Sequence, residues 1–170
     1  LELVAIPRAE VEVKAPTAPA ATGPEIVIDG GKPPPQAIHV DGNRLLLADG
    51  SPVWLQGVSI DSLQWSNEGE HILRSVVTAI DGWGVNAVRL PVTEDRWFGR
   101  ASGQKDGGAG YRAVIDQAVQ ACATRGVWLI LDLHRFRAPK QVHADFWQAV
   151  CEVYGNNPAV IFELFNEPHD

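Results

Sequence analysis

Residues 127–134 read VWLILDLH, and this stretch decides the fold class. Its first five positions are apolar without a break, which indicates a strand buried on both faces, as in a parallel sheet. Its last three, Asp132-Leu133-His134, bring an acid and an imidazole to the end of that strand. Packing of an apolar strand gives no reason for such an ending, so the end of the strand is a candidate functional position.

The same kind of apolar run occurs three more times, at residues 55–60, 87–90 and 160–165. Helical spacing of apolar residues lies between the runs, at 70–83, 111–125 and 143–154. A glycine follows each helix, where we expect a left-handed closing residue: Gly84, Gly126 and Gly155. This alternation predicts an α/β fold, the first four βα units of a (β/α)8 barrel. A closed barrel needs about 250 residues, so the chain supplies about half of one.

A proline-rich segment and a hairpin precede the strand–helix repeat. Residues 1–37 hold seven of the 12 prolines and are interpreted as a linker, or as the end of an upstream domain whose last strand would be 3–13. Residues 38–170 form the half barrel. They open with short strands at 38–40 and 45–47 joined by Asp41-Gly42, a hairpin that we expect to close one end of the barrel.

Composition excludes several classes of function. The net charge of -7 argues against a nucleic-acid partner, and no apolar run is long enough to span a membrane. Cys122 and Cys151 have no metal-type spacing and are expected to be small core residues, and we expect no metal and no cofactor. Leu1 is neither a start Met nor part of a signal peptide, so we expect both ends to be cuts within a longer protein.

Four polar residues occupy corresponding positions at the strand ends: Arg89, His134, Asn166 and Glu167. Each alone has a structural interpretation, such as a buried ion pair for Arg89 or a loop carboxylate for Glu167. Because carboxyl ends of barrel strands meet at one face, the four together predict an active site.

These motifs carry a family resemblance. The chain from residue 38 to 170 resembles the first half of glycoside hydrolase family 5, the cellulase-type family. The matching pieces are LQGV at 55–58, AVRLP at 87–91, LDLH at 131–134 and FNEP at 165–168.

The resemblance implies a role for each residue. Glu167 would be the general acid/base of a retaining hydrolase, and Asn166 would bond the sugar 2-OH. Arg89 and His134 would orient the catalytic carboxylates, and His169 would border the site.

The nucleophile is the main departure from the family pattern. In the family it is a Glu on the seventh strand, which these residues do not include. Strand alternation is taken to point Asp132 and Glu163 away from the site, so neither would replace it. The isolated fragment is therefore predicted to be inactive.

Six tryptophans divide into two groups. Trp65 and Trp97 fall in loops on the catalytic side, where they would either stack on sugar rings or anchor the loops. The others lie in regular elements and are predicted to be core residues: Trp54, Trp83, Trp128 and Trp147.

The leading interpretation is a secreted endo-β-glucanase-like hydrolase, monomeric at full length, with a polysaccharide as its only partner. Three alternatives remain: a related family of the same clan, a non-catalytic carbohydrate-binding barrel, and a phosphate-binding barrel enzyme. The choice among cellulose, other β-glucans, mannan and xylan stays open. A half barrel also exposes the edges of its first and fourth strands, which favours aggregation or dimerisation.

Overall fold

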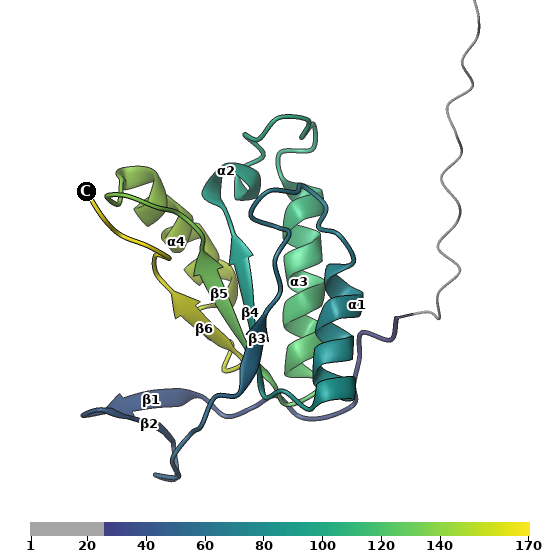
Figure 1. Cartoon of the computed structure of the whole chain (residues 1–170), viewed down its shortest axis with the longest axis vertical. Helices are drawn as coiled ribbons and strands as arrows, with labels where there is room; N and C mark the ends of the chain where they lie inside the picture. The colour runs from purple at the N-terminus through teal and green to yellow at the C-terminus, as the bar shows by residue number, and fades with distance from the viewer. Residues whose placement is uncertain (1–25) are drawn as a thin grey trace, which may run out of the picture.

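The four apolar runs form one parallel sheet in the computed structural model, which describes residues 26–170 (Figure 1). Its strands are β3 (Gly57–Ser59), β4 (Ala87–Val92), β5 (Trp128–Leu133) and β6 (Val160–Glu163), in the order β3-β4-β5-β6. Every neighbouring pair is parallel. The four strands and their order along the chain are confirmed, while the strand at 3–13, which was the alternative to a linker, lies outside the described residues.

The crossover helices follow the predicted places with one exception. They are α1 (Ile72–Val77), α3 (Ala109–Ala123) and α4 (Gln141–Tyr154). The predicted helix at 70–83 is divided, because α1 passes into a π-helix, η1 (Thr78–Gly82). Apolar residues three and four apart suit both helix types, so their spacing could not distinguish them. A short helix after β4, α2 (Glu94–Trp97), was not predicted.

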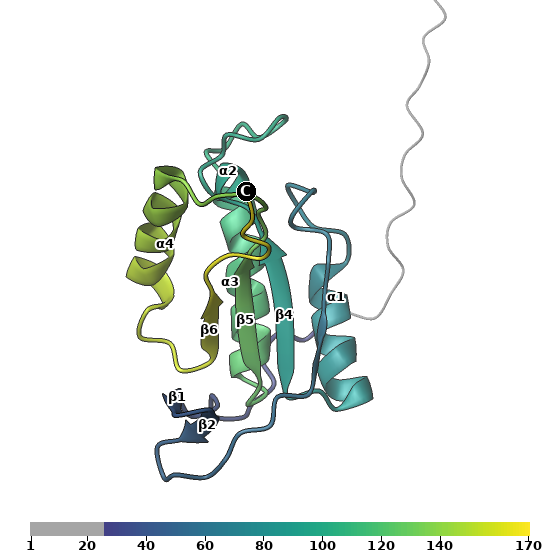
Figure 2. The same ribbon diagram turned by 60° about the vertical axis from the view of Figure 1, so that its left-hand side comes forward.

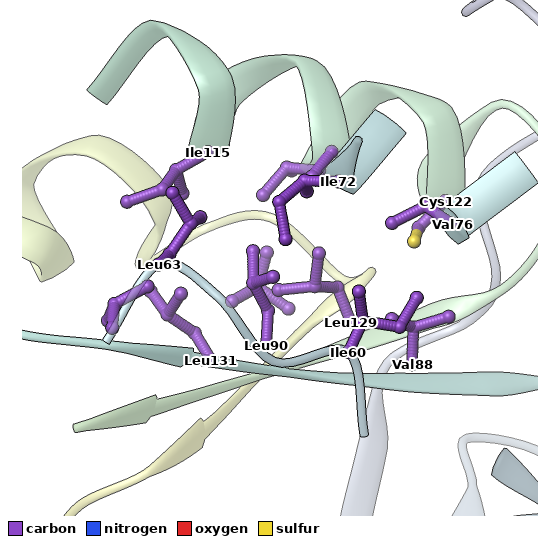
Figure 3. Packing of buried hydrophobic residues seen from close by; sticks show 14 of the residues in the cluster. Ile60, Leu63, Ile72, Val76, Val88, Leu90, Ile115, Cys122, Leu129 and Leu131 are labelled. Atoms are coloured by element: carbon purple, nitrogen blue, oxygen red, sulfur yellow. The ribbon is translucent and has the colours of Figure 1, made fainter. Parts of the chain in front are cut away.

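Strand alternation divides the sheet into two chemically different faces. On β4 and β5 every second residue is apolar and fully buried: Val88, Leu90, Val92, Leu129, Leu131 and Leu133. These side chains pack against Ile72 and Val76 of α1 and Ile115 of α3 (Figure 3). The residues between them, including Arg89, belong to the opposite face.

The predicted hairpin is confirmed as β1 (Ile38–Asp41) and β2 (Arg44–Leu47), paired antiparallel. Gly42 in its turn has φ of 62°, a conformation that favours glycine. The hairpin lies near the amino ends of the parallel strands, at the opposite end of the sheet from the chain's C-terminus (Figures 1 and 2).

Residues 26–36 contain no helix or strand, but they bind the C-terminal end of α3. Arg125 donates to the carbonyl oxygens of Val27 and Ile28 at 2.7 and 2.5 Å, and Lys32 N donates to Thr124 O at 2.7 Å. The described part of the predicted linker is therefore fixed to the α/β unit.

Several predictions about single residues are wrong. Trp54 and Trp83 are exposed, since no described element covers them, whereas Trp147 is partly buried against the core as predicted. Cys122 is buried as predicted, but Cys151 is exposed because it lies about 100° around α4 from buried Val150.

Gly84 and Gly126 have the expected positive φ, 70° and 71°. Gly155 instead keeps a helical φ of −57°. A Cβ there would lie 2.5 Å from Cys151 O, so close approach rather than handedness suits glycine to this position. No helix within residues 26–170 is both long and apolar enough to cross a membrane.

Candidate active site

Arg89 is the centre of a polar cluster on the face of the sheet opposite the helices. Its Nε and one Nη donate to the two carboxylate oxygens of Glu163, each at 2.7 Å. The same Nη donates to Asn166 Oδ1 at 2.9 Å and lies 2.9 Å from Asp132 Oδ2. We call Arg89, Asp132, Glu163 and Asn166 the Arg89 network. It joins β4, β5 and β6 at their carboxyl ends, where a parallel barrel places its chemistry.

The expectation that Asp132 and Glu163 point away from this site is wrong. Parallel register pairs Asp132 directly with Glu163 across β5 and β6. Asp132 also lies two residues before His134, so alternation gives both side chains the same face. Because His134 was assigned to the site, alternation counted back by two residues from it would have placed Asp132 on the same face.

His134 joins the network through Asp132. Its Nδ1 lies 2.7 Å from Asp132 Oδ2, and its ring is one-fifth exposed while Asp132 is fully buried. Burial raises the pKa of Asp132, although the hydrogen bond from His134 and the charge of Arg89 act to lower it. His134 therefore has its ring orientation set by a buried carboxyl group.

Hydrogen bonds with Glu163 raise the pKa of Arg89, against the opposing effect of burial, so its charge is permanent. Because Arg89 fixes Asn166 Oδ1, the other end of that amide is directed elsewhere. Asn166 Nδ2 is buried and has no hydrogen-bond partner within residues 26–170. The site thus contains an oriented amide donor without an acceptor among the described residues.

Glu167 is held by its main chain. Its N donates to Arg135 O at 3.2 Å, and Arg137 N donates to Glu167 O at 3.2 Å, so Phe136 and Glu167 form a parallel bridge. His169 Nδ1 also lies 2.9 Å from Glu167 O. The side chain of Glu167 is exposed at the end of β6, next to Asn166 in the chain.

The two loop tryptophans have different environments. Trp65 is 61% exposed, and Arg96 holds its backbone by donating to Trp65 O at 2.8 Å. Trp97 is only 4% exposed and packs edge-on against Phe146 and Tyr154. A stacking role for Trp97 is therefore wrong, and the alternative, anchoring, describes its position.

Two residues near Glu167 were missed in the sequence. Phe136 is half exposed and lies edge-on to His134 with ring centroids 5.4 Å apart. Arg135 binds Glu94 and Asp95 of α2. The acidic partners of Arg135 lie about 40 residues earlier in the chain, so the local sequence carried no sign of these ion pairs.

Several polar groups of different chemistry lie at or after the carboxyl ends of these strands. They comprise an exposed carboxyl group, an oriented amide, an imidazole and a permanently charged guanidinium. Residues 26–170 contain no group of three or more His, Cys, Asp or Glu side chains placed to hold a metal ion.

The order of the four parallel strands and their crossover helices is that of the first half of a (β/α)8 barrel. Residues 46–170 match the profile of the family described as Cellulase (glycosyl hydrolase family 5). The chain belongs to glycosyl hydrolase family 5. The family match confirms the resemblance and decides against a related family of the same clan.

Curated relatives agree with this assignment. Endoglucanase A of Butyrivibrio fibrisolvens is 30% identical over 137 residues, which cover 78% of this chain and 32% of the relative. Endoglucanase MaCel5A of Microbulbifer sp. (strain ALW1) is 27% identical over 140 residues, covering 78% of this chain and 26% of the relative.

Solved structures agree with the fold. The native β-glucanase SdGluc5_26A from Saccharophagus degradans has a TM-score of 0.62 and 26% identity, covering 88% of this chain and 47% of that one. Its complex with cellotetraose gives the same values. The chain spans about a third or less of the two curated relatives and about half of this structure. Its sheet is therefore half of a (β/α)8 barrel.

Proposed function

We propose that this chain supplies the acid/base half of a retaining endo-β-glucanase. The observation that carries the proposal is the Arg89 network, which orients Asn166 immediately before the exposed carboxyl group of Glu167. Endoglucanases among the relatives and a β-glucanase complex with cellotetraose support a β-glucan as the substrate.

In this mechanism Glu167 donates its proton to the glycosidic oxygen as the bond to the anomeric carbon breaks. It then removes a proton from the water that releases the sugar from the enzyme. Asn166 Nδ2 donates to the sugar 2-OH, an interaction that strengthens in the transition state. Arg89 and His134 keep this arrangement fixed through Asp132 and the Asn166 amide.

The nucleophile is a second carboxylate about 5 Å from Glu167. Glu163 is engaged by both donors of the Arg89 fork, and Asp132 is fully buried between Arg89 and His134. We therefore assign the nucleophile to a part of the complete protein outside these 170 residues.

Trp65 and His169 form the substrate-contacting edge in this proposal. Trp65 presents an exposed ring on a loop fixed by Arg96, and His169 lies beside the Glu167 carbonyl. The enzyme acts outside the cell, because its polymeric substrate is found there. Activity in culture supernatant rather than in the cell fraction would support this, and the reverse would contradict it.

The decisive variant is Glu167→Gln in the complete protein that contains this chain. Gln has the shape of Glu but has no proton to donate, so we expect hydrolysis of a soluble β-glucan to fall by about 10²–10⁴-fold. The measurement is the rate of release of reducing ends, with binding of cello-oligosaccharides retained.

Glu152→Gln is the matched control, because it makes the same change at an exposed carboxylate of α4. Full activity in Glu167→Gln would contradict the assignment. A wild-type protein that binds cello-oligosaccharides without cleaving them would instead favour the non-catalytic carbohydrate-binding barrel.

A further inference from the structure

The position of Glu167 depends on the loop between β5 and α4. The parallel ladder of β5 and β6 continues beyond the strands, with Asn166 N donating to Leu133 O at 3.1 Å and Glu167 N to Arg135 O at 3.2 Å. In the other direction Arg137 N donates to Glu167 O at 3.2 Å. Residues 135–137 are therefore the main-chain support against which the acid/base residue is held.

The side chain of Arg135 anchors that loop. Its Nε donates to Glu94 Oε2 at 2.5 Å and one Nη donates to Asp95 Oδ1 at 2.6 Å. Glu94 is almost fully buried, and its other oxygen lies 3.9 Å from His143 Nε2 on α4. Arg135 thus ties the support of Glu167 to α2.

The ion pairs of Arg135 are partly shielded from water, which strengthens them. Burial by itself lowers the pKa of Arg135, but the hydrogen bond to Glu94 and the charges of Glu94 and Asp95 offset this and raise it. Burial would raise the pKa of Asp95, yet the hydrogen bond from Thr93 and the charge of Arg135 lower it. Arg135 and Asp95 thus remain charged at neutral pH, and charge-assisted bonds of this kind fix geometry as well as contribute energy.

We propose that Arg135 is a positioning residue for the general acid, acting through the main chain of residues 135–137. It does not contact substrate. It fixes the position of Glu167 beyond the carboxyl end of β6. That position determines the distance between the carboxyl group and the glycosidic oxygen that receives its proton. This inference rests on the proposed function, and it adds a requirement that lies outside the Arg89 network.

Proton transfer is sensitive to such support, because a misplacement of about 1 Å can cost about 100-fold in rate. The sensitivity depends on the leaving group. A sugar alkoxide needs the proton as the bond to carbon breaks, whereas a dinitrophenolate is stable as an anion and leaves without it. The two leaving groups therefore separate a misplaced acid from a general loss of folded enzyme.

The test is Arg135→Ala in the complete protein, assayed with a cello-oligosaccharide and with the dinitrophenyl β-glycoside of the same sugar. We expect kcat/KM for the oligosaccharide to fall about tenfold or more, and kcat/KM for the dinitrophenyl glycoside to change less than about twofold. Equal losses on both substrates, or no loss on either, would overturn the proposal.

Two further variants secure the interpretation. Arg135→Lys retains the charge without the two-pronged geometry, so it should recover part of the oligosaccharide rate and covers the case in which Arg135→Ala does not fold. Arg44→Ala is the matched control, since it removes an exposed ion pair with Asp41 in the hairpin and should leave both rates unchanged.

Glu94→Gln should be non-additive with Arg135→Ala, because both remove the same interaction. Additive losses would mean that Arg135 acts by another route and would overturn the proposal. A wild-type protein inactive on both substrates would overturn the proposed function itself, and that result is distinct from every outcome for the variants.

Discussion

At the residue scale, the important feature of Arg89 is that one side chain satisfies acceptors from two other strands. It binds Glu163 with two parallel bonds and reaches both Asp132 and Asn166 with the same nitrogen. The planar guanidinium supplies these directions at once, which a lysine ammonium does not. The cluster is therefore built around an arginine rather than around a positive charge in general.

Two tryptophans provide a matched prediction at this scale. Trp65→Ala in the complete protein should weaken cello-oligosaccharide binding by about tenfold, or about 1.4 kcal/mol, because it removes an exposed ring from the proposed substrate-contacting edge. Trp97→Ala should instead lower the free energy of unfolding by about 3–5 kcal/mol, because its ring is buried in the core.

Titration calorimetry and urea unfolding measure the two effects. Unchanged glycan affinity in Trp65→Ala would remove this residue from the substrate site. A stability of Trp97→Ala equal to that of the wild type would contradict the core position of its ring.

The site was only partly predictable from single residues. Arg89, His134, Asn166 and Glu167 stand out because an apolar strand gives no packing reason for them. Asp132 and Glu163 were misplaced because the face of each was judged without the register of β5 against β6. Burial of Trp97 depends on Phe146 and Tyr154 of α4, about 50 residues later, so local sequence carried no sign of it.

At the scale of elements, α3 shows how a helix start is fixed by a loop residue. Asp106 accepts hydrogen bonds from the backbone N–H groups of Gly108 and Gly110, at 3.0 and 2.6 Å. These bonds, that of Gly110 first, lower the pKa of Asp106. The folded state therefore favours the charged form, which satisfies amides that the helix itself leaves unpaired.

This gives a pH-dependent prediction for Asp106→Ala. A depressed pKa in the folded state stabilises the protein above the unfolded value of about 3.9, and this contribution is lost as the pH falls through the lower, folded pKa. The variant should thus be less stable than the wild type in urea unfolding at pH 7, and the difference should shrink below about pH 4. Asp106→Asn should lie between them at pH 7, because it keeps one acceptor oxygen.

Equal differences at both pH values would mean that the charge of Asp106 contributes nothing to the free energy of unfolding.

The helices and strands themselves were well predicted, since β4, β5, α3 and α4 have apolar patterns that repeat over many residues. The exceptions are short. α2 has only four residues, and η1 differs from an α-helix in hydrogen bonding rather than in the spacing of apolar side chains.

At the scale of the whole molecule, the sheet has two open edges. β3 pairs only with β4 and β6 only with β5 among the described residues, so both present unpaired backbone groups. Between the hairpin and β6 lies an open cavity of about 540 Å³, and the apolar side chains that line it include Val40 and Phe162. Such surfaces favour association with another strand or another copy.

We therefore expect residues 1–170 expressed alone to elute as a species larger than a monomer and to hydrolyse no glucan. Size-exclusion chromatography with light scattering and a reducing-end assay test the two parts separately. A folded monomer would contradict the edge argument. Turnover of any glycan by the chain alone would show that the nucleophile lies within it.

The ion pairs of Arg89 also have a consequence for the way the chain folds. Because they link side chains from three separate strands, they form only when β4, β5 and β6 are aligned in the native register. A slip of one residue would turn a charged group into the apolar layer, and a slip of two would leave it without its counterion. The cluster thus destabilises misaligned arrangements of the three strands relative to the native one, so the residues of the proposed site also favour the correct strand register.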